Sequence, residues 1–236
     1  MPLPKKYSIS LIFPAYNDAG TIAELVEDGV RVLSDCAEKF EIIIVDDGSP
    51  DETERVGRRM AEKYPQVRLI RHPVHRGYGA ALKTGLEHTR DFELVCFTDG
   101  DYPIALSFIP RLLEFLADHD GVITRRINKP YGAFRGFISW LYNFSLRRLF
   151  GIAFADLNSP LKIYKKSVLR ETPWYSQSPF AVAEIVIRSR ERGAKLSEIP
   201  VASLPPKNQR SFSVRPRIIL ATILDGWKFI WRSGLY

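Results

Sequence analysis

The fold and chemistry of this chain are decided by the stretch Val95-Cys96-Phe97-Thr98-Asp99-Gly100-Asp101. A short apolar run, typical of a buried strand, ends in two carboxylates that are one residue apart. Because residues i and i+2 of an extended backbone point the same way, Asp99 and Asp101 can offer oxygens to one cation beyond the strand. Mg²⁺ or Mn²⁺ would neutralise their mutual repulsion and could also hold a diphosphate. Asp-Gly-Asp is also typical of a solvated turn, so the context has to decide.

The chain before this stretch alternates apolar runs with segments of helical spacing. Strands are predicted at residues 8–13, 41–45, 67–71 and 92–98, and helices from residue 22, over 51–64 and over 80–89. Thr21 is the expected N-cap of the first helix, with Glu24 completing a capping box. Apolar strands that alternate with helices predict a parallel sheet covered by helices on both faces.

Polar residues follow each of the four apolar runs. In an open parallel sheet, ligands bind beyond the carboxyl ends of the strands. We therefore expect one acidic site rather than four separate turns. Its residues would be Tyr16, Asn17 and Asp18 after the first run, Asp46 and Asp47 after the second, Arg76 and Gly77 after the third, and Asp99 and Asp101 after the fourth.

The second half of the chain is basic. Residues 1–124 contain 14 Lys and Arg against 21 Asp and Glu, whereas residues 125–236 contain 20 against 6, so the halves carry −7 and +14. Helices are predicted over 107–116, 135–150 and 181–192, strands over 121–124, 162–164 and 195–201, and loops over 125–130 and 202–214. The charge favours an anionic partner. No nucleic-acid recognition motif is found, and a lipid phosphate explains the charge as well, so no nucleic-acid partner is expected.

The composition limits the class of protein further. The chain of 236 residues, 45% hydrophobic, suits one large globular domain. Its longest stretch without a charged residue, 172–183, is shorter than the roughly 18 residues of a membrane-spanning helix. The N-terminus lacks the apolar core of a secretory signal, and two cysteines suit packing in a reducing compartment. We therefore expect a cytoplasmic protein that does not cross a membrane.

Taken together, these motifs resemble those of the nucleotide-sugar glycosyltransferases of family 2, and most closely those of the dolichol-phosphate mannose synthase and polyprenyl-phosphate glycosyltransferase branch. Pro14-Ala15-Tyr16-Asn17 is similar to the loop that holds the nucleotide base, and Val45-Asp46-Asp47-Gly48-Ser49 to the loop whose aspartate meets the base or ribose. Residues 77–85 resemble the glycine-rich third segment, and Asp99-Gly100-Asp101 the metal-binding Asp-X-Asp. The four motifs stand in the family's order.

The resemblance implies an α/β GT-A fold, a mostly parallel central sheet flanked by helices with a C-terminal amphipathic helix. It implies a glycosyltransferase domain over 1–214, with a nucleotide-sugar half at 1–124 and an acceptor half at 125–214, and an interfacial tail at 215–236. Mg²⁺ or Mn²⁺ would bind Asp99 and Asp101. The residues expected to bind the donor and this cation are Pro14, Ala15, Tyr16, Asn17, Asp18, Val45, Asp47, Gly77, Asp99, Gly100, Lys207 and Arg210.

The reaction implied is the inverting transfer of a sugar, mannose or glucose, from a GDP- or UDP-sugar to a polyprenyl phosphate, with Asp101 acting through the cation. Arg125 and Arg135 match arginines that face the acceptor phosphate in that branch. Such a phosphate is already anionic at neutral pH, so it needs cations for positioning more than it needs a base. Lys207 and Arg210 are further candidates for this positioning.

Other functions stay open. A sugar hydroxyl on a glycan or glycolipid would need a base, for which Glu184 is the candidate, although Glu184 could instead form an ordinary helical ion pair with Arg188. Pro103 replaces a polar residue of the branch, and residues 158–160 and 206–213 also depart from its pattern. These departures give some weight to a non-catalytic nucleotide-sugar binding protein.

The expected location is the cytoplasmic face of a membrane, as a peripheral protein. Aromatic residues of the helix over 135–150, such as Trp140 and Phe144, either insert at the headgroups or pack in the core. The same alternatives apply to the apolar face of the tail, with Trp227 and Trp231. The tail is also where a membrane partner subunit would attach.

Overall fold

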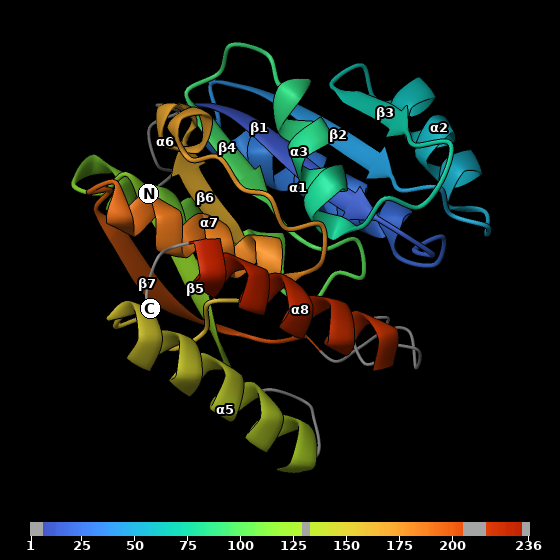
Figure 1. Ribbon diagram of the computed structural model, residues 1–236. Helices are drawn as coiled ribbons and strands as arrows, with labels where there is room; N and C mark the ends of the chain where they lie inside the picture. The colour runs from blue at the N-terminus through green and yellow to red at the C-terminus, as the bar shows by residue number, and fades with distance from the viewer. Residues whose placement is uncertain (1–6, 129–132, 205–215, 233–236) are drawn as a thin grey trace.

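The computed structural model describes residues 7–128, 133–204 and 216–232 (Figure 1). The first half contains β1 (Ser8–Ala15), α1 (Ile22–Cys36), β2 (Lys39–Asp46), α2 (Thr53–Lys63), β3 (Val67–Arg71), α3 (Tyr78–Glu87) and β4 (Leu94–Phe97). Helix α4 (Ile109–Glu114), flanked by two 3₁₀ turns, leads into β5 (Gly121–Ile127). The remainder contains α5 (Ala133–Phe150), β6 (Lys162–Lys165), α6 (Lys166–Glu171), α7 (Phe180–Glu191), β7 (Leu196–Ala202) and α8 (Pro216–Arg232).

The strands form one seven-stranded sheet in the order β3-β2-β1-β4-β6-β5-β7. β1 pairs in parallel with β2 and β4, β2 with β3, and β5 with β7. β6 runs antiparallel to both of its neighbours, β4 and β5. The mostly parallel sheet that the sequence predicts is therefore present, with one reversed strand inserted between its two halves.

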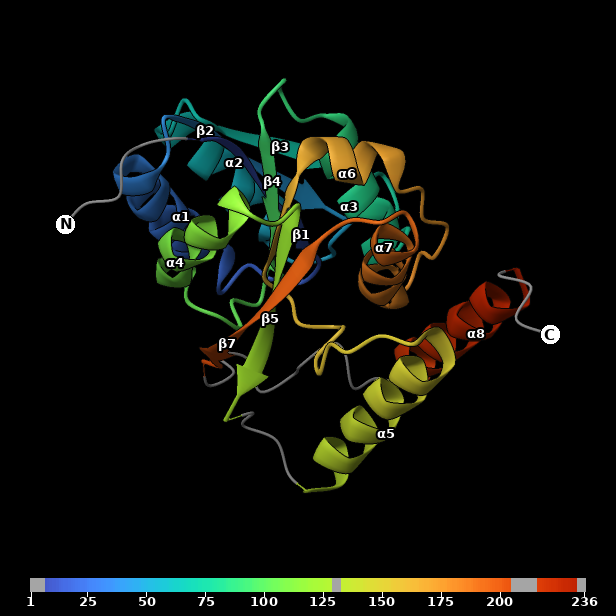
Figure 2. The ribbon, with the colours of Figure 1, turned by 90° about the vertical axis from the view of Figure 1, so that its left-hand side faces the viewer.

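Helices cover both faces of the sheet (Figure 2). On one face, β1, β2 and β4 pack against apolar residues of α1, α2 and α4, and both cysteines, Cys36 and Cys96, belong to this core. On the other face, the sheet packs against α3, α6 and α7. The strand residues are buried on both faces, which explains why β1, β2 and β4 are continuous apolar runs rather than alternating ones.

Helices α5 and α8 lie outside the second helical layer (Figure 1). Phe229 of α8 is 3% exposed, and its ring lies 5.2 Å from that of Phe150 and 5.6 Å from that of Phe180. Trp227 and Trp231 on the same helix are exposed. The tail therefore packs on the domain through one side of α8 and leaves an apolar face outside. Among the described helices, none is long and apolar enough to span a bilayer.

Two expectations about local structure are wrong, and one helix is missed. Thr21 stands at the N-cap position, but it makes no side-chain cap bond, because its hydroxyl donates to the carbonyl oxygen of Gly100 at 2.8 Å. Residues 125–127 belong to β5 rather than to a loop, since they pair with residues 200–202 of β7. Helix α6 is not predicted at all, because its six residues are too few to show a period.

Candidate active site

A cavity of about 980 Å³ lies beyond the carboxyl ends of the parallel strands. Residues after β1, β2, β3 and β4 all contribute to its lining, so the polar strand ends converge on one site, as the sequence predicts. From these strand ends the cavity is lined by Pro14, Ala15, Tyr16, Asp18, Asp47, His75, Arg76, Gly77, Asp99, Gly100 and Asp101.

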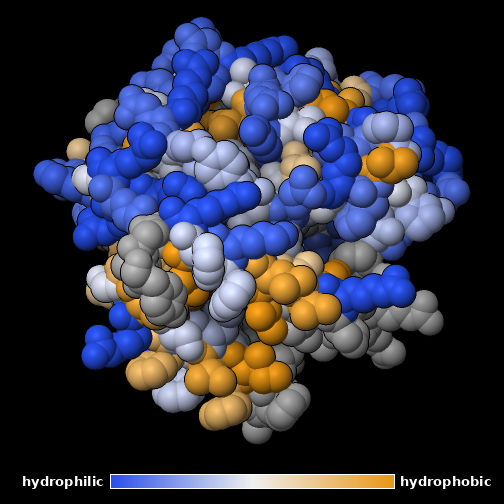
Figure 3. All heavy atoms as spheres, viewed as in Figure 1, coloured by the Kyte–Doolittle hydropathy of each residue, from blue (hydrophilic) through white to orange (hydrophobic). Residues whose placement is uncertain are grey.

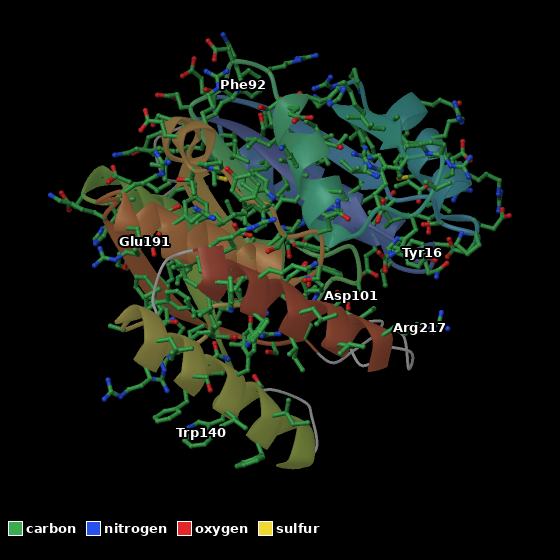
Figure 4. The ribbon with its side chains drawn as sticks, in the orientation of Figure 1. Tyr16, Phe92, Asp101, Trp140, Glu191 and Arg217 are labelled. Carbon is green, nitrogen blue, oxygen red and sulfur yellow. The ribbon has the colours of Figure 1, made fainter. Side chains whose placement is uncertain are left out.

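A second part of the cavity wall comes from α3 and from later in the chain. Figure 4 shows Arg217, at the start of α8, on the same side of the molecule as Tyr16 and Asp101. This wall is lined by Tyr78 and Ala81 of α3, Asn158, residues 177–179 and Val182 around the start of α7, and Arg217, Ile218, Ala221 and Asp225 of α8. Helix α8 is therefore part of the site.

Three carboxylates, those of Asp18, Asp99 and Asp101, gather in the cavity. Burial raises the pKa of Asp18 to about 8, and the negative charges of Asp101 and Asp99 contribute, although the Tyr16 N–H bond opposes the shift. Burial also raises the pKa of Asp99. Without a cation, burial and mutual repulsion therefore oppose the ionisation of these carboxyl groups, and a bound cation would relieve this condition.

Gly100 separates the two carboxylates for a steric reason. A β-carbon at this position would lie 2.5 Å from Oδ2 of Asp18 and 3.2 Å from the carbonyl oxygen of Pro14. The Asp18 oxygen is itself fixed by the Tyr16 N–H at 2.9 Å. Only glycine therefore lets the Asp99 and Asp101 loop lie directly against the loop after β1.

The carboxylate pair fits Mg²⁺ or Mn²⁺. Within the described residues, no group of three or more His, Cys, Asp or Glu side chains forms a complete cation cage. Mg²⁺ is commonly bound by one or two carboxylates together with substrate phosphates and water. Asp99 and Asp101 supply such an incomplete set, in a cavity large enough for a nucleotide diphosphate to complete it.

The adjacent residues Asp46 and Asp47 have different roles, because successive strand residues point to opposite sides. Asp46 is fully buried and accepts the Ser49 N–H at 3.1 Å. Asp47 accepts the N–H groups of Arg76 at 2.9 Å and Gly77 at 2.8 Å, and its Oδ1 lies 2.7 Å from Nδ1 of His72. Asp47 therefore shapes the 72–77 loop from the edge of the cavity.

Tyr16 and His75 form an aromatic wall of the cavity. Their ring centroids are 4.2 Å apart with the planes tilted by 41°, and Nδ1 of His75 lies 2.8 Å from Oδ2 of Asp47. Such a pair offers a flat, partly apolar surface with a polar edge, suited to a heterocyclic base. His75, in the loop after β3, thus contacts Tyr16 of the first motif and Asp47 of the second.

Glu184 is 1% exposed and does not line this cavity. Its carboxylate accepts the N–H of Tyr175 at 3.2 Å and that of Ser176 at 3.0 Å, and it pairs with Nε of Arg188 at 2.8 Å. The helical ion pair considered above is therefore formed. Glu184 holds the segment before α7 in place, and this geometry does not favour its use as a base.

The other predicted residues lie as follows. Val45 is buried in β2. Asn17, whose φ is 61°, donates its N–H to Oγ of Ser49 at 3.0 Å. Neither residue lines the cavity. Arg125 is an exposed residue of β5 away from the cavity lining. Arg135 belongs to α5, but its side chain lies outside the described structure, as do Lys207 and Arg210.

Several residues near the acidic cluster were not singled out from the sequence. Arg126 forms a two-point ion pair with Asp156, at 2.8 and 2.9 Å, and Lys162 is fully buried. The positive charges of Arg126 and Lys162 counter the rise in the pKa of Asp99. Burial lowers the pKa of Lys162 to about 7. Charged residues inside strands β5 and β6 are the signal that sequence reading could have used.

The motifs of the cavity agree with a family-level comparison. Residues 10–172 match the model of a family described as "Glycosyl transferase family 2". The chain belongs to this family. The match spans β1 to α6 and includes the Tyr16, Asp47, Gly77 and Asp99–Asp101 loops. The sequence-based assignment to family 2 is therefore confirmed.

Curated relatives of this family 2 member are named as undecaprenyl-phosphate sugar transferases. The chain is 32% identical over 173 residues to an undecaprenyl-phosphate 4-deoxy-4-formamido-L-arabinose transferase of Pseudomonas fluorescens, covering 71% of this chain and 50% of that protein. A transferase of the same name from Edwardsiella ictaluri is 31% identical over 166 residues, covering 69% and 50%. The chain thus spans about half the length of these curated relatives.

Solved structures confirm the GT-A fold. Glucosyl-3-phosphoglycerate synthase from Mycobacterium tuberculosis, in complex with Mn²⁺, UDP-glucose and phosphoglyceric acid, superposes with a TM-score of 0.75 at 19% identity, covering 95% of this chain and 80% of that one. A complex of the same enzyme with Mg²⁺ and UDP gives a TM-score of 0.69 at 20% identity, covering 92% and 78%. The likeness at this identity concerns the fold.

Proposed function

We propose that this family 2 glycosyltransferase moves a sugar, mannose or glucose, from a nucleotide-diphosphate sugar to the phosphate of a polyprenyl phosphate. The observation that carries the proposal is the position of Asp99 and Asp101 in a cavity that is also lined by α8, a helix with an exposed apolar face. The names of the curated relatives support the acceptor class. The UDP complexes of the GT-A neighbours make a UDP-sugar the first donor to test, before a GDP-sugar.

The chemistry follows from the residues of the two walls. Tyr16 and His75 would hold the base, while Asp99 and Asp101 would hold Mg²⁺ or Mn²⁺. When bound, the cation would neutralise the charge that develops on the donor diphosphate. An acceptor phosphate oxygen attacks the anomeric carbon from the face opposite the diphosphate, the bond from that carbon to the diphosphate oxygen breaks, and the configuration inverts. An anionic phosphate needs no base for this step.

We further propose that the protein acts at the cytoplasmic face of a membrane, on which α5 and α8 rest. Hydrophobic side chains gather over these two helices in the lower part of Figure 3, whereas the region above them is mostly hydrophilic. On α5, the rings of Phe137, Trp140 and Phe144 stack on one another at 6.0 and 5.3 Å and are 44–57% exposed. The charge of +14 over residues 125–236 would attract anionic headgroups, at roughly 1 kcal/mol per well-placed cation.

A binding and transfer experiment tests this function. Isothermal titration of UDP should show binding that requires Mn²⁺ or Mg²⁺, and sugar transfer to farnesyl phosphate should stop in excess chelator. Asp101→Asn should abolish transfer while leaving the unfolding midpoint near that of the wild type. Full transfer in chelator would overturn the metal assignment. Binding of UDP-sugars with no transfer to any phosphate or hydroxyl acceptor would favour the non-catalytic alternative.

A further inference from the structure

One face of α8 lines the catalytic cavity. Arg217, Ile218, Ala221 and Asp225 contribute to the lining and are spaced by one, three and four residues, which places them along one side of the helix. A different side carries the exposed apolar residues Leu220, Ile223, Leu224, Trp227 and Trp231. The helix thus separates the cavity from the surface that we propose to contact the membrane.

The position of α8 is fixed by two of its residues. Oδ2 of Asp225 accepts the N–H groups of Gln177 at 3.2 Å and Ser178 at 3.1 Å, just before α7. Phe229 is buried one turn further on, between Phe150 and Phe180. Because Arg217 lies two turns before Asp225 on the same rigid helix, these contacts determine where its side chain can reach.

The charged residues that line the cavity are mostly acidic, and Arg217 is one of the few cations among them. Five aspartates line the described cavity, namely Asp18, Asp47, Asp99, Asp101 and Asp225, and two arginines, Arg76 and Arg217. Arg76 belongs to the loop beside Tyr16 and His75, whereas Arg217 lies at the start of α8. The side chain of Arg217 is exposed, and it makes no hydrogen bond or ion pair with any residue that the structure describes.

We propose that Arg217 binds a phosphate group in this cavity, either of the donor diphosphate or of the acceptor. The assignment rests on the proposed function, because both ligands of that reaction carry phosphate. A guanidinium group presents paired N–H donors that match two phosphate oxygens, and it stays charged at every relevant pH. Because it lines an acidic cavity and pairs with none of the described residues, Arg217 is available to an anion that the aspartates alone would repel.

Two measurements on Arg217→Ala separate the two phosphate sources. If Arg217 binds the donor, the Kd for UDP in the presence of Mn²⁺ should rise by about 10- to 100-fold, as expected for a lost charge-assisted hydrogen-bond pair, with the KM for farnesyl phosphate unchanged. If it binds the acceptor, the KM for farnesyl phosphate should rise by a similar factor with the UDP Kd unchanged. Arg217→Lys, which keeps the charge but not the paired donors, should recover part of either loss.

Arg232→Ala is the matched control, since Arg232 is an exposed arginine at the other end of α8, outside this cavity. Thermal unfolding should give the same midpoint for the wild type and the variants, because neither guanidinium is buried. If the UDP Kd and the farnesyl phosphate KM of Arg217→Ala both stay within twofold of the wild-type values, the assignment of Arg217 is overturned but the proposed function is not. A wild-type protein that neither binds UDP nor transfers sugar would overturn the proposed function, and this assignment with it.

Discussion

The carbonyl oxygen of Ser176 lies so close to Gly79 that a β-carbon on residue 79 would be 2.0 Å from it. Gly79 also donates its N–H to the carbonyl of Gln177 at 2.9 Å, and a β-carbon on Gly77 would lie 2.5 Å from the same carbonyl oxygen. The glycines at the start of α3 therefore allow the segment before α7 to pack directly against this helix. Two parts of the chain about 100 residues apart form one wall of the cavity in this way.

Gly79→Ala should disrupt this wall. The new methyl group would displace main-chain atoms of Ser176, so we expect the free energy of unfolding to fall by about 1–3 kcal/mol and the affinity for UDP to decrease. Denaturant unfolding and calorimetric titration measure the two effects. Gly136→Ala in α5 is the control, because a β-carbon there meets no atom within 4 Å and alanine favours a helix. Equal behaviour of the two variants would contradict this explanation of the glycine-rich segment.

Glu184→Gln distinguishes the two acceptor classes. The substitution keeps an oxygen for the N–H groups of Tyr175 and Ser176 but removes the charge that pairs with Arg188. We expect the protein to lose about 1–3 kcal/mol of stability and to keep most of its turnover with a phosphate acceptor. Loss of turnover with unchanged stability would instead identify Glu184 as a base, and a sugar hydroxyl as the acceptor.

The stability of the cation-free protein should depend on the ionisation of Asp18. Burial raises its pKa from 3.8 to about 8, so between these values the folded protein holds a proton that the unfolded chain has released. The free energy of unfolding should therefore fall as the pH rises, by at most about 1.4 kcal/mol per pH unit, and level off above pH 8. Asp18→Asn has no ionisable carboxyl group at this position, so its stability should lack this pH dependence.

The difference in stability between the wild type and Asp18→Asn isolates the effect of this carboxyl group from other titrations. Measured in chelator, the difference should shift steadily against the wild type from pH 5 to pH 8. A difference that stays constant over that range would show that Asp18 ionises normally in the folded protein.

Trp227→Ser and Trp231→Ser should weaken binding to anionic vesicles. These side chains are 64% and 71% exposed on the outer face of α8, so their loss removes apolar contact with lipid without opening the core. Co-sedimentation with phosphatidylglycerol vesicles at low salt measures the effect. Val74→Ser, which changes a 64% exposed residue of the acidic half, should bind as the wild type does. Wild-type protein that stays in the supernatant would exclude the membrane contact.

Much of the donor side could be predicted from the sequence because its signals are local. The strands β1, β2 and β4 contain continuous apolar runs, and the polar residues that follow them mark the edge where ligands bind. Asp18, Asp47 and Asp99 could therefore be assigned to one site before their distances were known. The spacing of the motifs was enough because parallel strands end at the same edge.

The acceptor side was less predictable because its contacts are not local. Arg125 lies in the part of β5 that pairs only with β7, so it is exposed beside an unpaired edge of the strand. Arg217 and Asp225 were not predicted to belong to the site, because the apolar face is the dominant pattern of the tail. Their spacing along another side of the helix was visible, but only packing shows that this side meets the cavity.

The inserted strand β6 has a consequence for how the two halves of the chain depend on each other. β5 hydrogen-bonds to β6 and β7, both of which follow residue 160, and it makes no ladder with β4. A fragment that stopped at residue 124 would keep β5 without either of its partners. Residues 1–124 therefore contain four strands that pair with one another and the start of a fifth whose partners both come from the second half, so the two halves of the chain complete one sheet together.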